Sequence, residues 1–282
     1  MVAGSVFASD GSDSRFGVFR LNDDGSVDKQ TLERFESGKK AVGARILNLD
    51  AGYYLVVDSS VSASNDTDFA ARLLAPDFNL RADYADARVI DSQYHIGTPG
   101  NITSYDVASD AVLVSPSEVR IAGTSSDQAA IIGIKINWVL SPVLTSSVTF
   151  EGNHFDHLTL SQNLVTGTDL NQGVAAVRIA ARSDGALLLA ARADIWPAPT
   201  AGLVMRVDAQ GKPTTGFGDS NGEATYAAPM SDGTPSGDTG FAGLLIDAGR
   251  PLLFGTSMDT NTTDGVLLRL QSDRIFTDGY EL

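Results

Sequence analysis

The strongest constraint on this sequence is a short pattern that occurs five times. Each copy has an apolar strand ending in small residues, a polar loop, and a second strand with one basic residue between apolar neighbours. Those basic residues, spaced 52, 63, 71 and 63 positions apart, are Arg20, Arg72, Lys135, Arg206 and Arg269. Such a period is somewhat longer than that of common propeller repeats, about 40–50 residues. It predicts one β-rich unit per copy.

Two further strands complete the predicted unit. An apolar segment precedes each later copy, and turns such as Ser183-Asp184-Gly185 separate it from the next strand. We therefore predict an all-β fold, a β-propeller of about five four-stranded antiparallel blades. One domain, 1–282, would hold repeat units of roughly 1–40, 41–105, 106–165, 166–238 and 239–282.

The two terminal copies look incomplete. The first lacks its first strand, and the last ends after three. Either the partial units complement each other and the ring closes without an exposed edge, or the chain is a piece of a larger ring or needs a partner. The start, Met1-Val2-Ala3-Gly4, has no charged segment followed by an apolar one, so no signal peptide is visible.

Charge and cysteine usage exclude several classes. The chain has 35 acidic and 20 basic residues, a net charge of −15, which repels nucleic acid and anionic membrane surfaces. Cationic partners and calcium stay open. With no cysteine, disulfides, thiolate nucleophiles and cysteine-ligated metals are excluded. No apolar run approaches the roughly 18 residues of a membrane-spanning helix, so we expect no transmembrane segment.

At two places the sequence resembles a known bacterial repeat. The stretch from Val2-Ala3-Gly4-Ser5 through Phe19-Arg20-Leu21-Asn22-Asp23-Asp24-Gly25-Ser26-Val27-Asp28 resembles the delta-60 repeat, and so does 205–213 followed by Phe217-Gly218. The other copies are degenerate, with Pro76-Asp77 and Trp138-Val139 where the turn glycine should fall. The resemblance implies a propeller-like fold and no particular reaction.

The end of the chain carries a second resemblance. Residues 274–281, Arg-Ile-Phe-Thr-Asp-Gly-Tyr-Glu, resemble a terminal Ile-Phe-x-Asp-Gly-(Phe/Tyr)-Glu tail of exported proteins from xanthomonad-type bacteria. That resemblance implies export, so we expect a secreted or cell-surface protein of a Gram-negative bacterium.

Two acidic loops are candidate calcium sites. Calcium prefers six or more oxygen ligands, and alternating Asp and Asn on a tight turn supply several. The candidate ligands are Asp23, Asp24, Asp28, Asp259, Asn261 and Asp264. Neither loop follows the EF-hand order, and ordinary turn chemistry explains the same residues. We expect no other cofactor.

Among aromatic residues, Trp196 is the candidate ligand contact. It lies in the long polar loop beside Pro197, where an exposed indole can stack on the C–H face of a sugar. Trp138 directly follows a predicted strand and is expected in the core. His154 and His157 could share a metal with Asp156, but spacing places no further ligand, and a polar loop between blades explains the same residues.

The sequence leaves three functions open. The leading hypothesis is a non-catalytic, exported propeller that binds a protein or glycan through its variable loops. An alternative is a carbohydrate-active hydrolase or lyase with carboxylates at the central channel, although no residue is singled out as catalytic. A third is a structural spacer of a surface protein. The repeated basic residues are interpreted as architectural, each bonding turn carboxylates or carbonyls of its own or the next blade.

Overall fold

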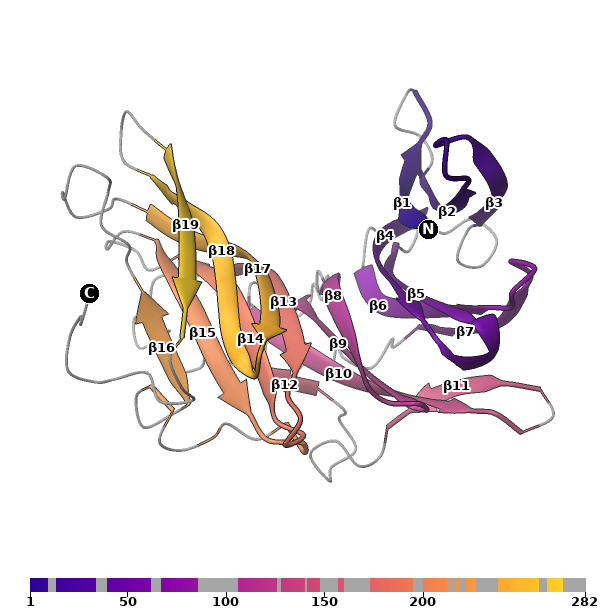
Figure 1. Cartoon of the computed structure of the whole chain (residues 1–282). Coiled ribbons are helices and arrows are strands. Elements are labelled where there is room, and N and C mark those ends of the chain that lie inside the picture. Colours follow the sequence, from indigo (N-terminus) through magenta and orange to yellow (C-terminus); the bar gives the residue numbers. More distant parts are fainter. Residues whose placement is uncertain are drawn as a thin grey trace, which may run out of the picture. The chain divides into compact units, whose positions relative to one another are not determined.

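The computed structural model contains strands throughout the residues it describes, with one short 3-10 turn, η1 (Asp50–Gly52), and no α-helix among them (Figure 1). The described residues are 1–9, 14–33, 40–61, 67–85, 106–125, 128–139, 141–147, 157–159, 173–194, 200–211, 214, 217–218, 222–226, 238–258 and 263–270.

The strands form five sheets in chain order, one in each predicted repeat unit to within a residue. The first has order β1 (Val2–Phe7), β2 (Ser14–Leu21), β3 (Val27–Glu33). The second has order β4 (Lys40–Asn48), β5 (Tyr54–Val61), β6 (Thr67–Leu74), β7 (Leu80–Ala85).

The third sheet contains β8 (Asp106–Ser115), β9 (Glu118–Ser125), β10 (Gln128–Asn137) and β11 (Val143–Ser146), with β12 (His157–Thr159) also paired to β10. The fourth has order β13 (Gly173–Ala181), β14 (Leu187–Asp194), β15 (Ala201–Val207), β16 (Glu223–Tyr226). The fifth has order β17 (Asp238–Asp247), β18 (Arg250–Met258), β19 (Thr263–Arg269).

This arrangement confirms the all-β, antiparallel prediction. The second and fourth sheets have the predicted four strands, and the two terminal sheets have three strands among the described residues. The first strands β4, β13 and β17 all carry a register shift part-way along their pairing. Such bulges increase the local twist of a strand, and they recur here as part of the repeat.

A five-residue turn recurs between neighbouring strands. Its third residue is an aspartate whose carboxylate accepts the N–H two residues on: Asp24 from Ser26 at 2.8 Å, Asp77 from Asn79 at 3.1 Å and Asp184 from Ala186 at 3.0 Å. The fourth residue has positive φ in each case, Gly25 at 83°, Phe78 at 67° and Gly185 at 84°. The turn predicted to be degenerate at Pro76-Asp77 therefore forms with a non-glycine residue at that position.

The chain folds as two compact units. The first comprises 1–121, 132–148 and 154–156. In it, the first and second sheets pack through a cluster of apolar side chains, Phe16, Val18, Val56, Leu74 and Phe78. Burial of the Phe78 side chain in that cluster offsets the cost of its left-handed backbone, of order 1–2 kcal/mol.

The second unit comprises 122–131, 149–153 and 157–282. Its core joins the fourth and fifth sheets, with Phe241 of β17 against Leu188 and Val204. Gly202 of β15 permits this contact, because a Cβ there would lie 2.6 Å from the Phe241 ring. The ring therefore packs directly against the backbone of the neighbouring sheet.

Candidate functional site

Two aromatic side chains meet at a turn-bearing edge of the first unit. Tyr53 precedes β5 and Trp138 follows β10. Their ring centroids are 5.3 Å apart, and the rings stand at 75°, edge to face, which is a favoured geometry for aromatic pairs. The Trp138 Nε1–H donates to the carbonyl of Pro116 at 3.2 Å, in the turn between β8 and β9. The indole is thus fixed by contacts to two separate turns.

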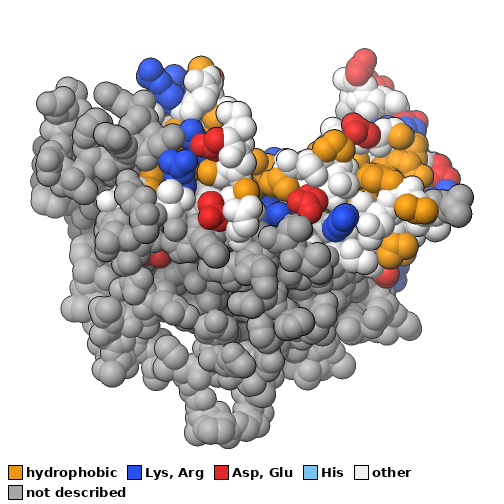
Figure 2. All heavy atoms as spheres, turned by 90° about the horizontal axis from the view of Figure 1, so that it is seen from below, with side chains coloured by type: hydrophobic (Ala, Val, Ile, Leu, Met, Phe, Trp, Pro, Cys, Tyr) orange, Lys and Arg blue, Asp and Glu red, His pale blue; other side chains and the backbone are white. Residues whose placement is uncertain are grey.

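Trp138 lies beside other exposed apolar side chains, while Tyr53 is half-buried. Trp138 is 38% exposed, the adjacent Val139 75%, and Val143 at the start of β11 is also exposed. Figure 2 shows hydrophobic side chains gathered on the side of the described surface where Figure 1 places β7 and β11. The prediction that Trp138 belongs to the core was wrong. The strand ends at Asn137, and the turn that follows carries the indole outward.

Three of the five repeated basic residues bind an acidic residue at a hairpin of their own sheet. Arg20 pairs with Asp28 and Arg269 with Asp247, and Arg206 lies 3.2 Å from Asp184. These contacts confirm the architectural interpretation for the three arginines. Lys135, in contrast, is exposed on β10.

Arg72 departs from that pattern. Arg20 lies two positions before Asn22, the first residue of its turn. The equivalent turn of the second sheet begins at Ala75, and the residue two positions before Ala75 is Leu73. Arg72 is therefore one residue out of register, and alternation along the strand directs it to the opposite face. There it is 1% exposed, 3.5 Å from a fully buried Asp58 of β5, and its guanidinium lies 5.6 Å from the Phe16 ring centroid.

The buried Asp58 is the most perturbed acid in the described residues. Burial raises its pKa to about 7, and the nearby Arg72 opposes that rise. Its two carboxylate oxygens accept no hydrogen bond from the part of the chain that the structure describes. Desolvation disfavours the carboxylate more than an ion pair without hydrogen bonds restores it. The sequence carried a signal here, an aspartate inside an apolar strand, that we did not single out.

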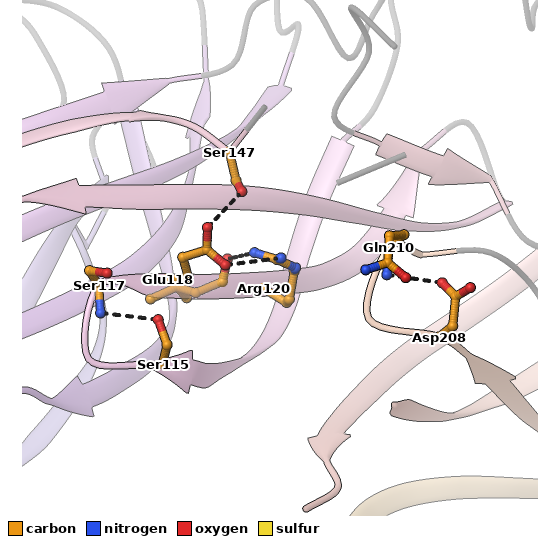
Figure 3. A network of polar contacts seen from close by, with 8 residues as sticks. Ser115, Ser117, Glu118, Arg120, Ser147, Asp208 and Gln210 are labelled. Carbon is orange, nitrogen blue, oxygen red and sulfur yellow. Dashed lines mark hydrogen bonds and ion pairs between the residues drawn. The ribbon is translucent and has the colours of Figure 1, made fainter. Parts of the chain in front are cut away.

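A second polar group lies in the third sheet (Figure 3). Glu118 of β9 contacts Arg120 on the same strand at 3.4 Å and accepts from the Ser147 hydroxyl at 3.3 Å. The Arg120 side chain is almost fully buried, while Glu118 is a quarter exposed. Ser115 Oγ accepts the Ser117 N–H at 3.3 Å in the adjoining turn. These contacts fix the β8–β9 hairpin that carries Pro116, the partner of Trp138.

Four of the predicted calcium ligands lie in the described residues, Asp23, Asp24, Asp28 and Asp264. Asp24 accepts from both the N–H and the hydroxyl of Ser26, and these bonds lower the Asp24 pKa. Asp28 pairs with Arg20, Asp23 is exposed, and Asp264 is half-buried in β19. Within the described ranges, no group of three or more His, Asp or Glu side chains is placed so that it could hold a metal ion. Calcium binding stays a prediction.

Several predicted residues lie outside the described residues: Trp196, Asp259, Asn261, His95, His154 and Asp156. His157 begins β12. In the described part of the chain no helix is long and apolar enough to cross a membrane.

Comparison with known proteins supports the fold and leaves the activity open. No protein-family model and no curated protein matches the sequence. A Dyadobacter fermentans protein of unknown function is similar in structure, with a TM-score of 0.52 and 13% identity over 93% of this chain and 66% of that one. A Trypanosoma rangeli sialidase, solved with the inhibitor DANA, is similar with a TM-score of 0.50 and 10% sequence identity. That match covers 94% of this chain and 41% of the sialidase.

This chain thus spans 66% and 41% of the two matched structures. At 13% and 10% identity the likeness concerns fold alone. Together with the five successive antiparallel sheets, it supports a propeller-like all-β architecture.

Proposed function

We propose that this chain is a β-propeller that acts outside the cell as a binding module, and that it binds through the surface around Tyr53 and Trp138. The observation that carries the proposal is the exposed Trp138 indole, held rigidly against the half-buried Tyr53 ring at a turn-bearing edge. Rigid Trp and Tyr side chains supply large contact area at low entropic cost, and they dominate binding energy in protein interfaces. Export is supported by the resemblance of residues 274–281 to the tails of exported proteins.

The chemistry of this surface limits its ligands. Its exposed side chains are mainly apolar, Trp138, Val139 and Val143, and the only donor of the indole already binds Pro116. The surface therefore offers ring faces and apolar area more than hydrogen bonds. A glycan that presents a C–H face, or an apolar side chain of a protein, matches this chemistry.

Ring closure belongs to the same proposal. The first sheet packs on the second through one face, and its other face exposes apolar side chains, Val2, Val6, Leu21, Val27 and Leu32. The fifth sheet likewise exposes Leu245, Phe254, Met258 and Leu267 on the face away from the fourth. Covering both terminal faces is what a closed ring of blades achieves, which supports the five-bladed propeller.

The first experiment is binding of the full chain to a panel of glycans and polysaccharides, with and without calcium, and with analysis of the bound material for cleavage products. We expect a ligand whose affinity falls at least ~30-fold in Trp138→Ala, because hot-spot truncation costs about 2 kcal/mol or more. Trp138→Phe should retain part of the affinity. Trp196→Ala is the matched control, since it removes an indole from another loop.

The outcomes separate the hypotheses. Loss of binding in Trp196→Ala but not in Trp138→Ala would move the site to the other loop. Released oligosaccharides would favour the carbohydrate-active alternative. A panel without any ligand would exclude glycans, and pull-down on Trp138-dependent protein partners would then decide between a protein-binding module and a spacer. A calcium requirement abolished by Asp24→Asn would establish the first acidic loop as a calcium site.

A further inference from the structure

One aspartate beside the aromatic pair is not used by its own turn. The carboxylates of Asp24, Asp77 and Asp184 each accept a backbone N–H within their turns. Asp50 lies instead at the second position of the turn 49–53, where its side chain is exposed. Among the described residues, its carboxylate takes part in no hydrogen bond or ion pair. The carboxylate is therefore available to a ligand.

The backbone of this turn departs from the repeat. Ala51 has φ 57° and Gly52 has φ 77°, whereas in the equivalent turn of the fourth sheet only Gly185 has positive φ. The Tyr53 N–H donates to the Asp50 carbonyl at 3.4 Å, which is long for such a bond. Residues other than glycine rarely adopt the left-handed conformation, and those that do cluster at binding and catalytic sites. The conformation of Ala51 therefore marks this turn as a candidate for function.

The groups next to the indole favour a ligand that donates hydrogen bonds. The Trp138 N–H already binds the Pro116 carbonyl. Pro116 has no N–H of its own, and neither has Pro76, which packs so closely on Gly52 that a Cβ there would lie 3.3 Å from the proline ring. The indole face and the Asp50 carboxylate remain available. A ligand with N–H donors and a positive charge matches them, because cations are attracted both to indole faces and to carboxylates.

Two basic residues near this surface do not cancel the charge of Asp50. Arg81 pairs with Asp77 of the adjoining turn at 3.9 Å. Lys135 lies three residues before Trp138, which corresponds to about 10 Å of strand. Exposed charges separated by more than about 10 Å are largely screened in 0.1 M salt. The net charge of −15 also attracts cations at longer range. Electrostatics therefore favour a cationic ligand at this surface.

We infer that the surface formed by Asp50, Tyr53 and Trp138 binds an arginine or lysine side chain of a partner protein. The apolar stem of that side chain lies against Val139, and its cationic head lies over the indole face within reach of the Asp50 carboxylate. Arginine and lysine both combine a hydrophobic stem with a charged, donor-rich head. The inference rests on the proposed function and narrows its ligand to a basic segment of another protein.

The test compares two labelled peptides that differ chiefly in charge. The probes are acetyl-Gly-Arg-Gly-Arg-Gly-amide and the same peptide with citrulline, which is uncharged but similar in size and shape to arginine. In fluorescence-anisotropy titrations with the full chain, we expect the arginine peptide to bind at least ~5-fold more tightly, because an exposed cation–π contact and an exposed ion pair both strengthen its binding. Asp50→Asn should reduce this ratio to about 2 or below. The matched control is Gln210→Lys in an exposed turn of the fourth sheet, which changes the net charge equally and should leave the ratio unchanged.

A second pair of variants separates this inference from the proposed function. Trp138→Ala should weaken both peptides, and Trp138→Phe should keep the preference for arginine. Binding of both peptides through Trp138 with equal affinity would keep the aromatic site but overturn the cationic ligand. So would a neutral glycan that binds through Trp138 while neither peptide binds.

Two further outcomes are also decisive. An equal fall of the ratio in Asp50→Asn and Gln210→Lys would assign the preference to overall charge and overturn the inference. If neither the peptides nor any glycan bind through Trp138, the proposed function fails and the inference fails with it. An unchanged midpoint in urea denaturation confirms that Asp50→Asn is folded.

Discussion

The second and fourth sheets use an arginine and an aspartate in two opposite ways. In the fourth sheet Arg206 reaches Asp184 near the surface, where the two side chains are 18% and 43% exposed. In the second sheet Arg72 and Asp58 are almost fully buried between sheets. Asp184 is the third residue of the turn between β13 and β14. In the second sheet, the third residue of the equivalent turn between β4 and β5 is Ala51, so no aspartate corresponds to Asp184 there. Side chains alternate between the two faces of a strand, so a displacement by one residue turns Arg72 to the opposite face of its sheet, where its guanidinium is buried.

The difference shows that a repeated residue does not imply a repeated role. At the surface, attraction is weakened by solvent, and Asp184 also accepts the Ala186 N–H. Partial burial opposes ionisation of Asp184, but that hydrogen bond, with Arg182 and Arg206, lowers its pKa. In the core, burial dominates and raises the pKa of Asp58. The same two residue types therefore respond oppositely to pH and to mutation.

The largest expected effect comes from breaking the buried pair. Asp58→Ala at pH 8 leaves the Arg72 charge desolvated without its counter-ion, and we expect the free energy of unfolding to fall by about 3–5 kcal/mol. Urea denaturation measures it, with circular dichroism confirming a folded variant at zero denaturant. A loss below 1 kcal/mol would mean that solvent reaches Arg72 and that the two pairs are equivalent.

Replacing both members of the buried pair by apolar residues should leave the free energy of unfolding unchanged or raise it. Asp58→Val with Arg72→Met removes two desolvated charges and keeps roughly similar volume. Such replacements are neutral or stabilising by about 1–4 kcal/mol elsewhere, and we expect the same here in urea denaturation. If the double variant is as unstable as Asp58→Ala, the pair contributes a specific interaction that apolar packing does not replace.

The pH dependence of stability separates the two pairs next. Asp58 has a pKa of about 7 in the folded chain and an ordinary value near 3.9 when unfolded. The folded state therefore binds the proton more tightly, so stability should decrease as pH rises from about 5 to 7, by up to about 1.4 kcal/mol per pH unit. Urea midpoints across this range should show the slope, and Asp58→Asn should abolish it. A slope unchanged in that variant would assign the effect to other groups.

The smallest effect is expected at the surface pair. A double-mutant cycle with Arg206→Met and Asp184→Asn should give a coupling free energy of about 0.2–1 kcal/mol, reduced further in 1 M salt. Asparagine retains an acceptor for the Ala186 N–H, so the turn is preserved. A coupling above 2 kcal/mol would show that exposure does not distinguish the pairs.

The repeat could be predicted from sequence because all strands of a sheet come from one copy of the repeat. Arg20, Arg206 and Arg269 recur beside their hairpin acids, and that recurrence marks the sheets correctly. The burial of Arg72 could not be predicted, because its copy of the repeat can be aligned with the others in two ways that differ by one residue. Only the turn with Phe78 at its fourth position decides between them. The positive φ of Phe78 could not be predicted, because a search for glycine at this turn position does not find a phenylalanine.

The aromatic surface was missed for a local reason. Trp138 follows an apolar strand, which favoured a core position, although Ser141-Pro142 just beyond it is a turn signal that places it at a strand end. Its partner Tyr53 comes from another sheet, and no spacing within one copy links the two. Pairs formed between sheets need the arrangement of sheets, which a single repeat does not encode.

The aspartate turn has a consequence for how such a protein diversifies. Because the carboxylate bonds the backbone of its own turn, as Asp24 and Asp77 do, each turn is a self-contained module whose geometry asks little of its surroundings. Segments between the strands can then be exchanged or lengthened with small effects on folding. The strand framework and the segments between strands can therefore vary independently, so that one architecture can present different surfaces.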